Sequence, residues 1–373
     1  MHSSPNNYNN HRPPQNQPRV LFILKRREDF HDCPSYSQNG LSTGLLNSAS
    51  FVQDMLIRQG VESKTVVVID NNDIDREVSA FKPTHVIIEA IWVVPEKFDV
   101  LSRLHPTVKW VVRYHSETPF IANEGIAMSW LFDYARRPNV YIGINAPRFM
   151  DEVRVMLRAA GLSHSEVQQR VIFLPNYYPI PQAIQAQRPN TRSHIVNVGC
   201  FGAIRPLKNH LLQATAALRF ANMIGKVLLF HVNIGRVEMK GDPILNNLKA
   251  MFDNIGHSGH QLIIHKWAPH DKFIELVKNM DIGLQVSFSE TFNIVAADMV
   301  TSGIPVVVSN EIPWAKAGVV SSTTSSVEIA RTLKETYEDW NTNIRLNNRG
   351  LRGYVETSTS FWLDFLQRQT VKF

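Results

Sequence analysis

The sequence predicts an α/β protein built from two doubly wound domains, and three observations carry this prediction. Short, nearly continuous apolar runs recur in two series, and segments with helical periodicity separate the runs. Such runs are typical of strands buried on both faces of a parallel sheet, and their alternation with helices indicates repeated β–α units. A stretch rich in proline, glutamine and asparagine, residues 176–193, divides the two series. With 373 residues, of which 44% are hydrophobic, the chain can bury two cores.

The N-terminal part begins with a polar segment and continues with the first series of strands. The segment MHSSPNNYNNHRPPQNQP lacks an apolar stretch behind a basic one, so residues 1–17 are expected to be a disordered tail and not a secretory signal. An N-terminal domain is expected over residues 18–180. Its strands are predicted at residues 19–24, 64–70, 85–93, 108–115, 140–145 and 171–176.

A linker over residues 181–193 is expected to lead into a C-terminal domain at residues 194–353. Strands of this domain are predicted at residues 194–201, 226–234, 261–267, 281–287 and 304–310. The last segment, residues 354–370, is expected to form a helix that packs back on the N-terminal domain through Phe361, Trp362 and Phe365. Ligands of doubly wound sheets bind beyond the carboxyl ends of the strands, so a shared ligand is expected in the cleft between the domains.

Composition limits the class of function. The formal charge of +6 favours anionic partners such as nucleotides, nucleic acid or acidic glycans without choosing among them. The two cysteines, Cys33 and Cys200, have no metal-type spacing, so neither a disulfide framework nor a zinc site is indicated, and a cytoplasmic location is expected. The longest apolar stretch, residues 85–94, contains Glu89 and is too short to span a bilayer, so no transmembrane segment is predicted.

The turn after the strand at 194–201 has the composition of a diphosphate site. Gly199 and Gly202 allow the backbone to approach a ligand, and Arg205 and Lys208 place two cations at the start of a helix. A plainer interpretation stays open, namely a β–α turn with two solvated cations.

The turn after the strand at 281–287 adds two acids. Backbone N–H groups precede an expected helix in the turn formed by Ser289, Glu290, Thr291, Phe292 and Asn293. Glu290 is expected in the cleft, and Asp298, about two helical turns later, is expected on a similar face. One carboxylate can accept hydrogen bonds from sugar hydroxyls, and the other from a ribose. The alternative is a helix with a favourable acid at its start and a solvated aspartate further on.

Together, these two turns resemble the nucleotide-sugar-binding domain of the GT-B glycosyltransferases, and in particular the retaining family GT4. In that family a glycine-rich turn with arginine and lysine is followed by an acid, seven residues and a second acid, and then by a strand like SGIPVVVS at 302–309. The resemblance covers most of residues 194–310 and implies the GT-B fold, in which two Rossmann-like doubly wound domains face each other across a cleft. Asp298 departs from the usual second glutamate and is shorter by one methylene.

The resemblance implies the roles of individual residues. The implied catalytic residues are His115, Arg205, Lys208 and Glu290. The implied donor-binding residues are Gly44, Gly202, Arg205, Lys208, Ser289, Glu290, Thr291, Phe292, Asn293 and Asp298. His115 ends a predicted strand, and a structural role for it stays open. The long loop at residues 25–46 contains Gly44 and a basic triplet, Lys25, Arg26 and Arg27, that is expected either to face an acceptor or to be a solvated patch.

No catalytic metal is expected, because the Asp-x-Asp sequence at residues 73–75 lies after a strand of the N-terminal half and is interpreted as a loop. No cofactor is expected beyond the donor, a nucleotide sugar such as a UDP-sugar. The resemblance implies transfer of a hexosyl or pentosyl group with retention of anomeric configuration.

The acceptor stays open. The basic charge and the lack of a membrane-docking amphipathic helix favour a hydroxymethylated pyrimidine in DNA, as in viral base-glucosylating enzymes, with a location in the host cytoplasm if the chain is of phage or viral type. Glycan or polysaccharide acceptors are commoner in the family. A catalytically dead sugar-nucleotide-binding protein is the third alternative. The oligomeric state does not follow from the sequence.

Overall fold

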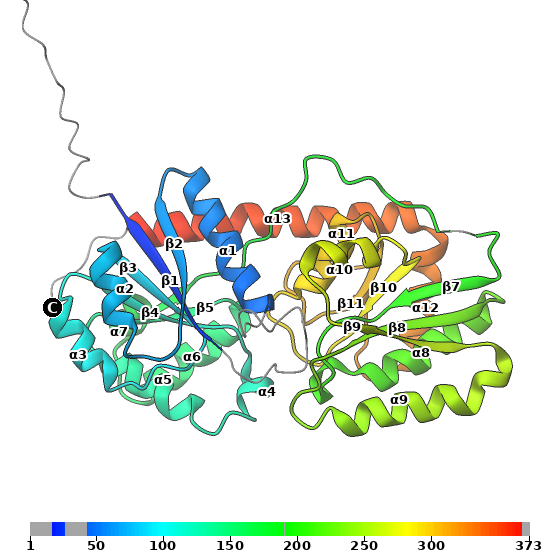
Figure 1. Ribbon diagram of the computed structural model, residues 1–373, viewed down its shortest axis with the longest axis horizontal. Helices are drawn as coiled ribbons and strands as arrows, with labels where there is room; N and C mark the ends of the chain where they lie inside the picture. Colours follow the sequence, from blue (N-terminus) through cyan, green and yellow to red (C-terminus); the bar gives the residue numbers. More distant parts are fainter. Residues whose placement is uncertain (1–16, 27–42, 190, 368–373) are drawn as a thin grey trace, which may run out of the picture.

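The computed structural model describes residues 17–26, 43–189 and 191–367, and these residues form two six-stranded parallel sheets (Figure 1). The first sheet has the order β2-β1-β3-β4-β5-β6. Its strands are β1 (Arg19–Lys25), β2 (Glu62–Val68), β3 (His85–Glu89), β4 (Lys109–Tyr114), β5 (Val140–Ile144) and β6 (Val171–Phe173). The helices around it are α1 (Thr43–Arg58), α2 (Ile74–Phe81), α3 (Lys97–Leu104), α4 (Thr118–Ile121), α5 (Ala127–Arg136), α6 (Pro147–Ala159) and α7 (His164–Arg170).

The second sheet has the order β12-β11-β10-β7-β8-β9. Its strands are β7 (Ile195–Gly199), β8 (Val227–Ile234), β9 (Gln261–Lys266), β10 (Ile282–Gln285), β11 (Val306–Ser309) and β12 (Val320–Ser321). It is accompanied by α8 (His210–Met223), α9 (Asp242–Ile255), α10 (His270–Val277), α11 (Ile294–Thr301), α12 (Ser326–Glu338) and α13 (Trp340–Gln367), and by the short 3-10 turns η1 (Pro206–Lys208) and η2 (Gly256–Ser258).

The predicted class, two doubly wound α/β domains, is confirmed. Every residue of β3, β4, β10 and β11 is buried, as expected for central strands of a parallel sheet covered on both faces. All eleven predicted strands form, and the short edge strand β12 was not predicted. Several strands end earlier than predicted. For example, β3 stops at Glu89, and the next residue, Ala90, has a φ of 68°, which is not an extended conformation. We keep residues 18–180 and 194–353 as proposed domain limits.

The long helix α13 runs along both sheets (Figure 1). Its first half packs on the C-terminal domain, where the Asn347 side chain bonds the backbone of Val306 at 3.1 and 3.3 Å. Its second half packs on the N-terminal domain, where Trp362 and Phe365 join a core cluster with Phe22. The predicted return of the chain to the first domain is therefore present, but the helix begins at Trp340 and not at residue 354.

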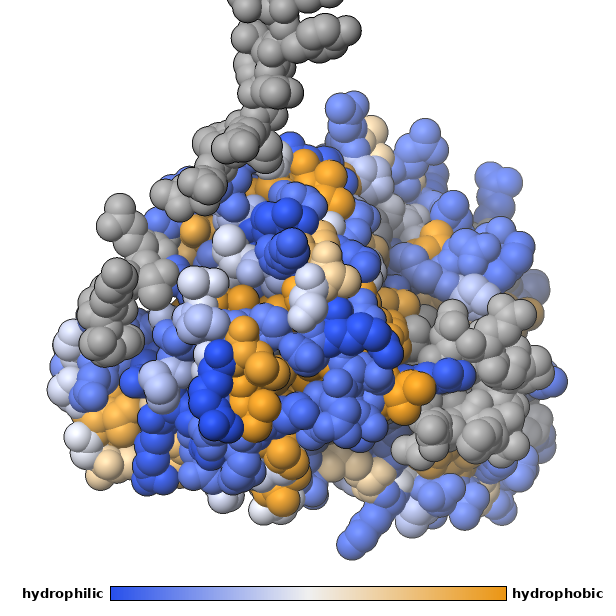
Figure 2. Space-filling model, turned by 60° about the vertical axis from the view of Figure 1, so that its left-hand side comes forward, coloured by the Kyte–Doolittle hydropathy of each residue, from blue (hydrophilic) through white to orange (hydrophobic). Residues whose placement is uncertain are grey.

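Some expectations concern residues outside the described ranges. These are the tail at residues 1–16, Arg27 and Cys33 in the long first loop, and the end of the predicted last helix at residues 368–370. Lys25 and Arg26, at the end of β1, are exposed. Among the described helices, none is both long and apolar enough to cross a membrane. Figure 2 shows mostly hydrophilic side chains on the face that it presents, with hydrophobic ones in several separate patches, which is ordinary for a protein surface.

We predict that Trp362→Ala lowers the free energy of unfolding by about 3–5 kcal/mol, the usual cost of removing a large buried ring. The Trp362 ring lies 5.8 Å from that of Phe22 and 5.2 Å from the Arg113 guanidinium, and its Nε1 donates to the Pro175 carbonyl at 2.9 Å. Urea denaturation measures the change.

The matched control is Phe361→Ala on the same helix, because this ring keeps 38% of its surface exposed. We expect it to cost about 1 kcal/mol. Equal losses for the two variants would show that α13 is not anchored through Trp362.

Candidate active site

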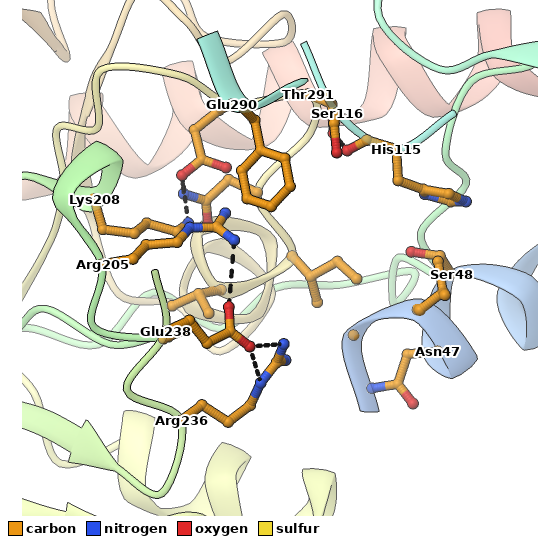
Figure 3. Close-up of a pocket in the computed structure, with 18 of the residues that line it drawn as sticks. Asn47, Ser48, His115, Ser116, Arg205, Lys208, Arg236, Glu238, Glu290 and Thr291 are labelled. Carbon is orange, nitrogen blue, oxygen red and sulfur yellow. Dashed lines mark hydrogen bonds and ion pairs between the residues drawn. The ribbon is translucent and has the colours of Figure 1, made fainter. Parts of the chain in front are cut away.

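A cavity of about 360 Å³ lies where the carboxyl ends of the two sheets face each other (Figure 3). The sequence-predicted residues that line it are Gly44, His115, Gly202, Arg205, Lys208, Ser289, Glu290, Thr291, Asn293 and Asp298. Phe292 does not line it. This ring is buried and packs against Tyr178, Trp314 and Tyr354, so its contribution to the site is to anchor the turn.

The cavity lies at the switch point of the second sheet, where the order of the strands reverses. The chain runs from β7 to β8 and β9 on one side and then returns to β10 on the other side of β7. The loops after β7 and β10 meet at this switch point, where doubly wound proteins bind their ligands in a crevice. The Phe288 amide donates to the Leu207 carbonyl at 2.9 Å and ties the two loops together.

Lys208 and Glu290 meet across this crevice. The Lys208 ammonium contacts Glu290 Oε1, and both side chains are largely buried. Asn293 Nδ2 also donates to Glu290 Oε1 at 3.1 Å. Asn293 caps the N-terminus of α11, where its side chain accepts from the Ala296 amide at 2.9 Å and its φ is 63°, a left-handed conformation that asparagine tolerates. The Lys208 ammonium, the Glu290 carboxylate and the N-terminus of α11 thus lie together at the cavity.

Arg205 adds a second cation. Its Nη1 lies 3.6 Å from Glu238 Oε2, and Glu238 also binds Arg236, so two arginines share one carboxylate. The Arg205 guanidinium lies 4.7 Å from the centre of the Phe120 ring, which belongs to the N-terminal domain. In Figure 3, Arg205, Lys208, Arg236, Glu238 and Glu290 occupy one side of the cavity. Arg205, Lys208 and Arg236 can bind a diphosphate, and Glu238, Glu290 and Asp298 line the cavity from the same domain.

The two predicted glycines have different roles. Gly202 has a φ of 117° and lines the cavity, and its amide donates to Asn233 Oδ1 at 2.9 Å. Gly199 does not approach the cavity. A Cβ at Gly199 would lie 2.7 Å from the Phe201 ring and 3.0 Å from Met280 Cγ, so Gly199 is needed for close packing behind the site.

His115 lies just after β4, at the opposite wall of the cavity. Its Nε2 contacts Glu89 Oε2, and Glu89, which is fully buried, also accepts from Arg113 Nη1 at 3.1 Å. Burial, acting against the attraction of Glu89, lowers the pKa of the His115 imidazole. The ring is therefore held in one orientation and in its neutral form.

Asp298, whose carboxylate was expected to contact a ribose, is buried at the wall of the cavity. It is 2% exposed, and its Oδ1 accepts from the Tyr178 hydroxyl at 2.6 Å and pairs with His270 Nε2 at 2.7 Å. Burial raises the pKa of the Asp298 carboxyl, and the hydrogen bond from His270 to Asp298 raises the pKa of the imidazole. His270 is partly exposed and lines the cavity, so the imidazole lies between Asp298 and the cavity.

The two domains also contact each other beside the cavity. Asn145 Nδ2 donates to Thr291 Oγ1 at 3.2 Å, and Thr291 Oγ1 donates to the His115 carbonyl at 3.3 Å. Arg148, from α6, contacts both Glu117 and Glu311. Burial raises the pKa of the Glu117 carboxyl to about 7, although Arg148 opposes the shift.

Several cavity residues were not predicted from the sequence. They are Asn47, Ser48, Phe120, Asn233, Arg236, Glu238, Trp267 and His270. Asn233 is next to the last residue of β8, which ends at Ile234, and Arg236 and Glu238 follow in the next loop; Trp267 and His270 follow β9. For these five residues, the position at a strand end was the available signal, since such residues face the cleft in this fold class. Asn47 and Ser48 lie in α1 and Phe120 lies in α4, where no such signal exists.

Within the described ranges, no group of three or more histidine, cysteine, aspartate or glutamate side chains is placed to hold a metal ion. Both acids of the Asp-x-Asp sequence at residues 73–75 bind other groups of the N-terminal domain. Asp73 Oδ2 accepts from the Ile69 amide at 3.0 Å, and Asp75 Oδ1 lies 2.7 Å from His105 Nε2. Metal independence stays a prediction.

No protein-family model and no curated protein matches the sequence. Solved structures do match over nearly the whole chain. One is the UDP-forming α,α-trehalose-phosphate synthase of Burkholderia vietnamiensis, with 10% identity, a TM-score of 0.63, and 94% of this chain and 97% of that chain covered. The sucrose-phosphate synthase of Thermosynechococcus elongatus is 11% identical, with a TM-score of 0.62 and 94% and 98% covered.

A third match is HepE of Anabaena in complex with UDP-glucose, which is 11% identical, with a TM-score of 0.60 and 93% and 99% covered. These likenesses show that the chain has the GT-B fold, as expected from its sequence. At such low identities they show the fold alone. Membership in GT4 stays a prediction, because likenesses at this identity do not show a family. A phage or viral origin also stays a prediction, and none of the three structures is described as viral.

We predict that the titration of Glu117 makes the protein less stable as the pH rises. The carboxyl has an ordinary pKa of 4.5 and a pKa of about 7 in the folded protein. Between these values the unfolded chain loses this proton while the folded protein keeps it, so the free energy of unfolding falls as the pH rises, by up to about 3 kcal/mol.

Urea denaturation of the wild type and of Glu117→Gln at pH 5 and pH 8 measures this contribution. We expect the difference in the free energy of unfolding between the two proteins to change from pH 5 to pH 8 by the predicted amount. A Glu117→Gln variant with the same pH dependence as the wild type would contradict the raised pKa.

Proposed function

We propose that this protein is a retaining glycosyltransferase that moves a hexosyl or pentosyl group from a nucleoside diphosphate sugar, such as a UDP-sugar, to an acceptor hydroxyl. One observation carries the proposal. The Lys208–Glu290 pair, with Arg205 beside it, lies in the crevice at the switch point of the second sheet of a GT-B fold. Lysine and arginine bind anionic groups such as phosphates, and a carboxylate accepts hydrogen bonds from hydroxyls. A nucleoside diphosphate sugar carries both kinds of group.

The cations are assigned to the leaving diphosphate. Arg205 and Lys208 neutralise the charge that develops on the diphosphate as the bond to the anomeric carbon breaks. Lys208 already faces a carboxylate oxygen, so a phosphate oxygen can join Glu290 as its partner. The amides at the N-terminus of α11 face the same crevice and favour an anion there.

Glu290 and His115 are assigned to the sugar. Glu290 accepts hydrogen bonds from sugar hydroxyls. The neutral His115 ring, whose Nε2 contacts Glu89 and whose Nδ1 lies 3.4 Å from Asn145 Nδ2, borders the sugar without adding a charge. With retention, the acceptor oxygen bonds to the anomeric carbon on the face that the diphosphate leaves. A diphosphate oxygen takes the acceptor proton, so no protein base is required.

The Asp298–His270 pair is assigned to the ribose of the donor. The Asp298 carboxylate fixes the ring of His270 at the cavity wall, and the imidazole can hydrogen-bond a ribose hydroxyl that the shorter side chain does not reach. HepE was solved with UDP-glucose, which supports a UDP-sugar as the donor to test first.

Two acceptor classes meet the chemical requirement for a hydroxyl nucleophile, a glycan and a hydroxymethylated pyrimidine in DNA. The net charge of +6 is the observation that favours DNA. The complete set of cations, sugar contacts and oriented histidine favours an enzyme over a catalytically dead binding protein, and a donor-hydrolysis assay separates the two. The cytoplasmic location stays a prediction.

Removing the diphosphate contacts tests the leaving-group assignment. We predict that Arg205→Ala and Lys208→Ala each lower turnover of the nucleotide sugar by about 100- to 1,000-fold, as loss of transition-state charge stabilisation does. Initial rates of UDP release at saturating donor measure the effect.

Lys334→Ala, which removes a lysine paired with Glu338 on the surface of α12, is the matched control and should keep wild-type turnover. A folded double variant of Arg205 and Lys208 that retains wild-type turnover would sink the diphosphate assignment.

Metal independence is tested by chelation. We predict that activity persists in excess EDTA, because the described site neutralises the leaving diphosphate with protein cations. UDP release is compared before and after chelation and after magnesium is restored. Complete loss that magnesium reverses would mean that a metal site has been missed.

A further inference from the structure

Two interactions hold the guanidinium of Arg205 within the described part of the chain, and neither is a hydrogen bond. The first is with Glu238, whose Oε2 lies 3.6 Å from Arg205 Nη1, too far for a hydrogen bond. Arg205 Nε is buried and has no hydrogen-bond partner among the described residues. A guanidinium carries its N–H donors around the edge of its plane. The donors of Arg205 are therefore available to a ligand in the cavity that it lines.

The second interaction is with an aromatic ring of the other domain. The guanidinium lies over the ring of Phe120, with 4.7 Å between Arg205 Cζ and the ring centre. The face of a ring attracts a cation through its quadrupole and leaves the N–H groups at the edge of the guanidinium unoccupied. Phe120 can therefore fix the plane of the guanidinium while the donors stay free, whereas a carboxylate in the same place would bind them.

Phe120 is itself held in place. It lies in the single turn of α4, where the Phe120 amide donates to the Glu117 carbonyl at 2.9 Å. The next residue, Ile121, is buried in the core of the N-terminal domain, and the Thr118 hydroxyl contacts Glu152 of α6. The turn is thus attached to its own domain on both sides of Phe120, so the ring has a fixed position from which it can orient Arg205.

We propose that Phe120 is a positioning residue that orients the Arg205 guanidinium towards the donor diphosphate. This inference rests on the proposed function and adds a residue of the N-terminal domain to the donor site. A guanidinium with a fixed plane and free donors can bind two phosphate oxygens side by side. Because the contact crosses between the domains, the orientation of Arg205 depends on the N-terminal domain being in place beside it.

A packing role for Phe120 makes a different prediction. If the side chain did no more than fill space beside Arg205, leucine would serve nearly as well, because it is also large and apolar. Leucine has no ring face to attract a cation, whereas tyrosine keeps one. Phe120→Leu and Phe120→Tyr therefore separate orientation by a ring from the filling of space.

The test is a double-mutant cycle of Phe120 and Arg205. The wild type is first titrated calorimetrically with UDP and with other nucleoside diphosphates. A protein that binds none of them fails as the proposed enzyme, and the inference fails with it. For the nucleotide that binds, the dissociation constant and the turnover of the corresponding nucleotide sugar are then measured for the wild type, Phe120→Leu, Arg205→Ala and the double variant.

We expect Phe120→Leu to weaken nucleotide binding and to lower turnover by about 3- to 30-fold, the size expected for the loss of a cation–π contact. In the Arg205→Ala protein the same change should have less than about a twofold effect, because the cation that Phe120 orients is gone. Phe120→Tyr should stay within about twofold of the wild type, because it keeps the ring.

Phe132→Leu is the matched control, because Phe132 is a partly buried phenylalanine of the same domain that does not line the cavity. It should leave nucleotide binding unchanged. Thermal melting shows whether each variant is folded, and Phe120→Met, which also lacks a ring, replaces Phe120→Leu if that variant does not fold.

Three results would overturn the inference while leaving the proposed function intact. They are equal losses from Phe120→Leu in the presence and absence of Arg205, a folded Phe120→Leu variant with wild-type binding and turnover, and a Phe120→Tyr variant as impaired as Phe120→Leu.

Discussion

The contact between Lys208 and Glu290 is the interaction on which the site depends. It joins the loops after β7 and β10 at the switch point of the second sheet, and both partners are largely buried. Burying an ion pair costs desolvation, and replacing such a pair by apolar side chains is often neutral or stabilising. The pair is therefore poorly explained as a device for stability. It fits the proposed function, in which a phosphate and a sugar hydroxyl join partners that are already in place.

The site also requires that the N-terminal domain holds its wall of the cavity in place opposite the Lys208–Glu290 pair. The helix α13 packs on both domains, and contacts such as Asn145 to Thr291 cross beside the cavity. Within the N-terminal wall, the buried Arg113 holds Glu89, and Glu89 orients His115. Each wall thus has its own internal support. Under the proposed function, the side chains assigned to the substrates are oriented before a substrate arrives, which reduces the cost of positioning them.

Much of the fold and part of the site could be predicted, because both depend on local patterns. Apolar runs mark strands buried on both faces, and the cations Arg205 and Lys208 follow one such run directly. The remainder depends on partners far apart in the sequence. The enclosure of Asp298 comes from Tyr178 and His270, and the packing role of Gly199 comes from Met280 and Met299. No spacing rule links such residues, so only the folded chain reveals them.

The most direct test of this account is a crystal structure of the protein with UDP and a non-transferable UDP-sugar analogue. The account predicts that the diphosphate lies within hydrogen-bond distance of Arg205 and Lys208, with the sugar between Glu290 and His115 and the ribose near His270. A nucleotide bound elsewhere, or a diphosphate that contacts neither cation, would contradict the assignment of this crevice as the donor site.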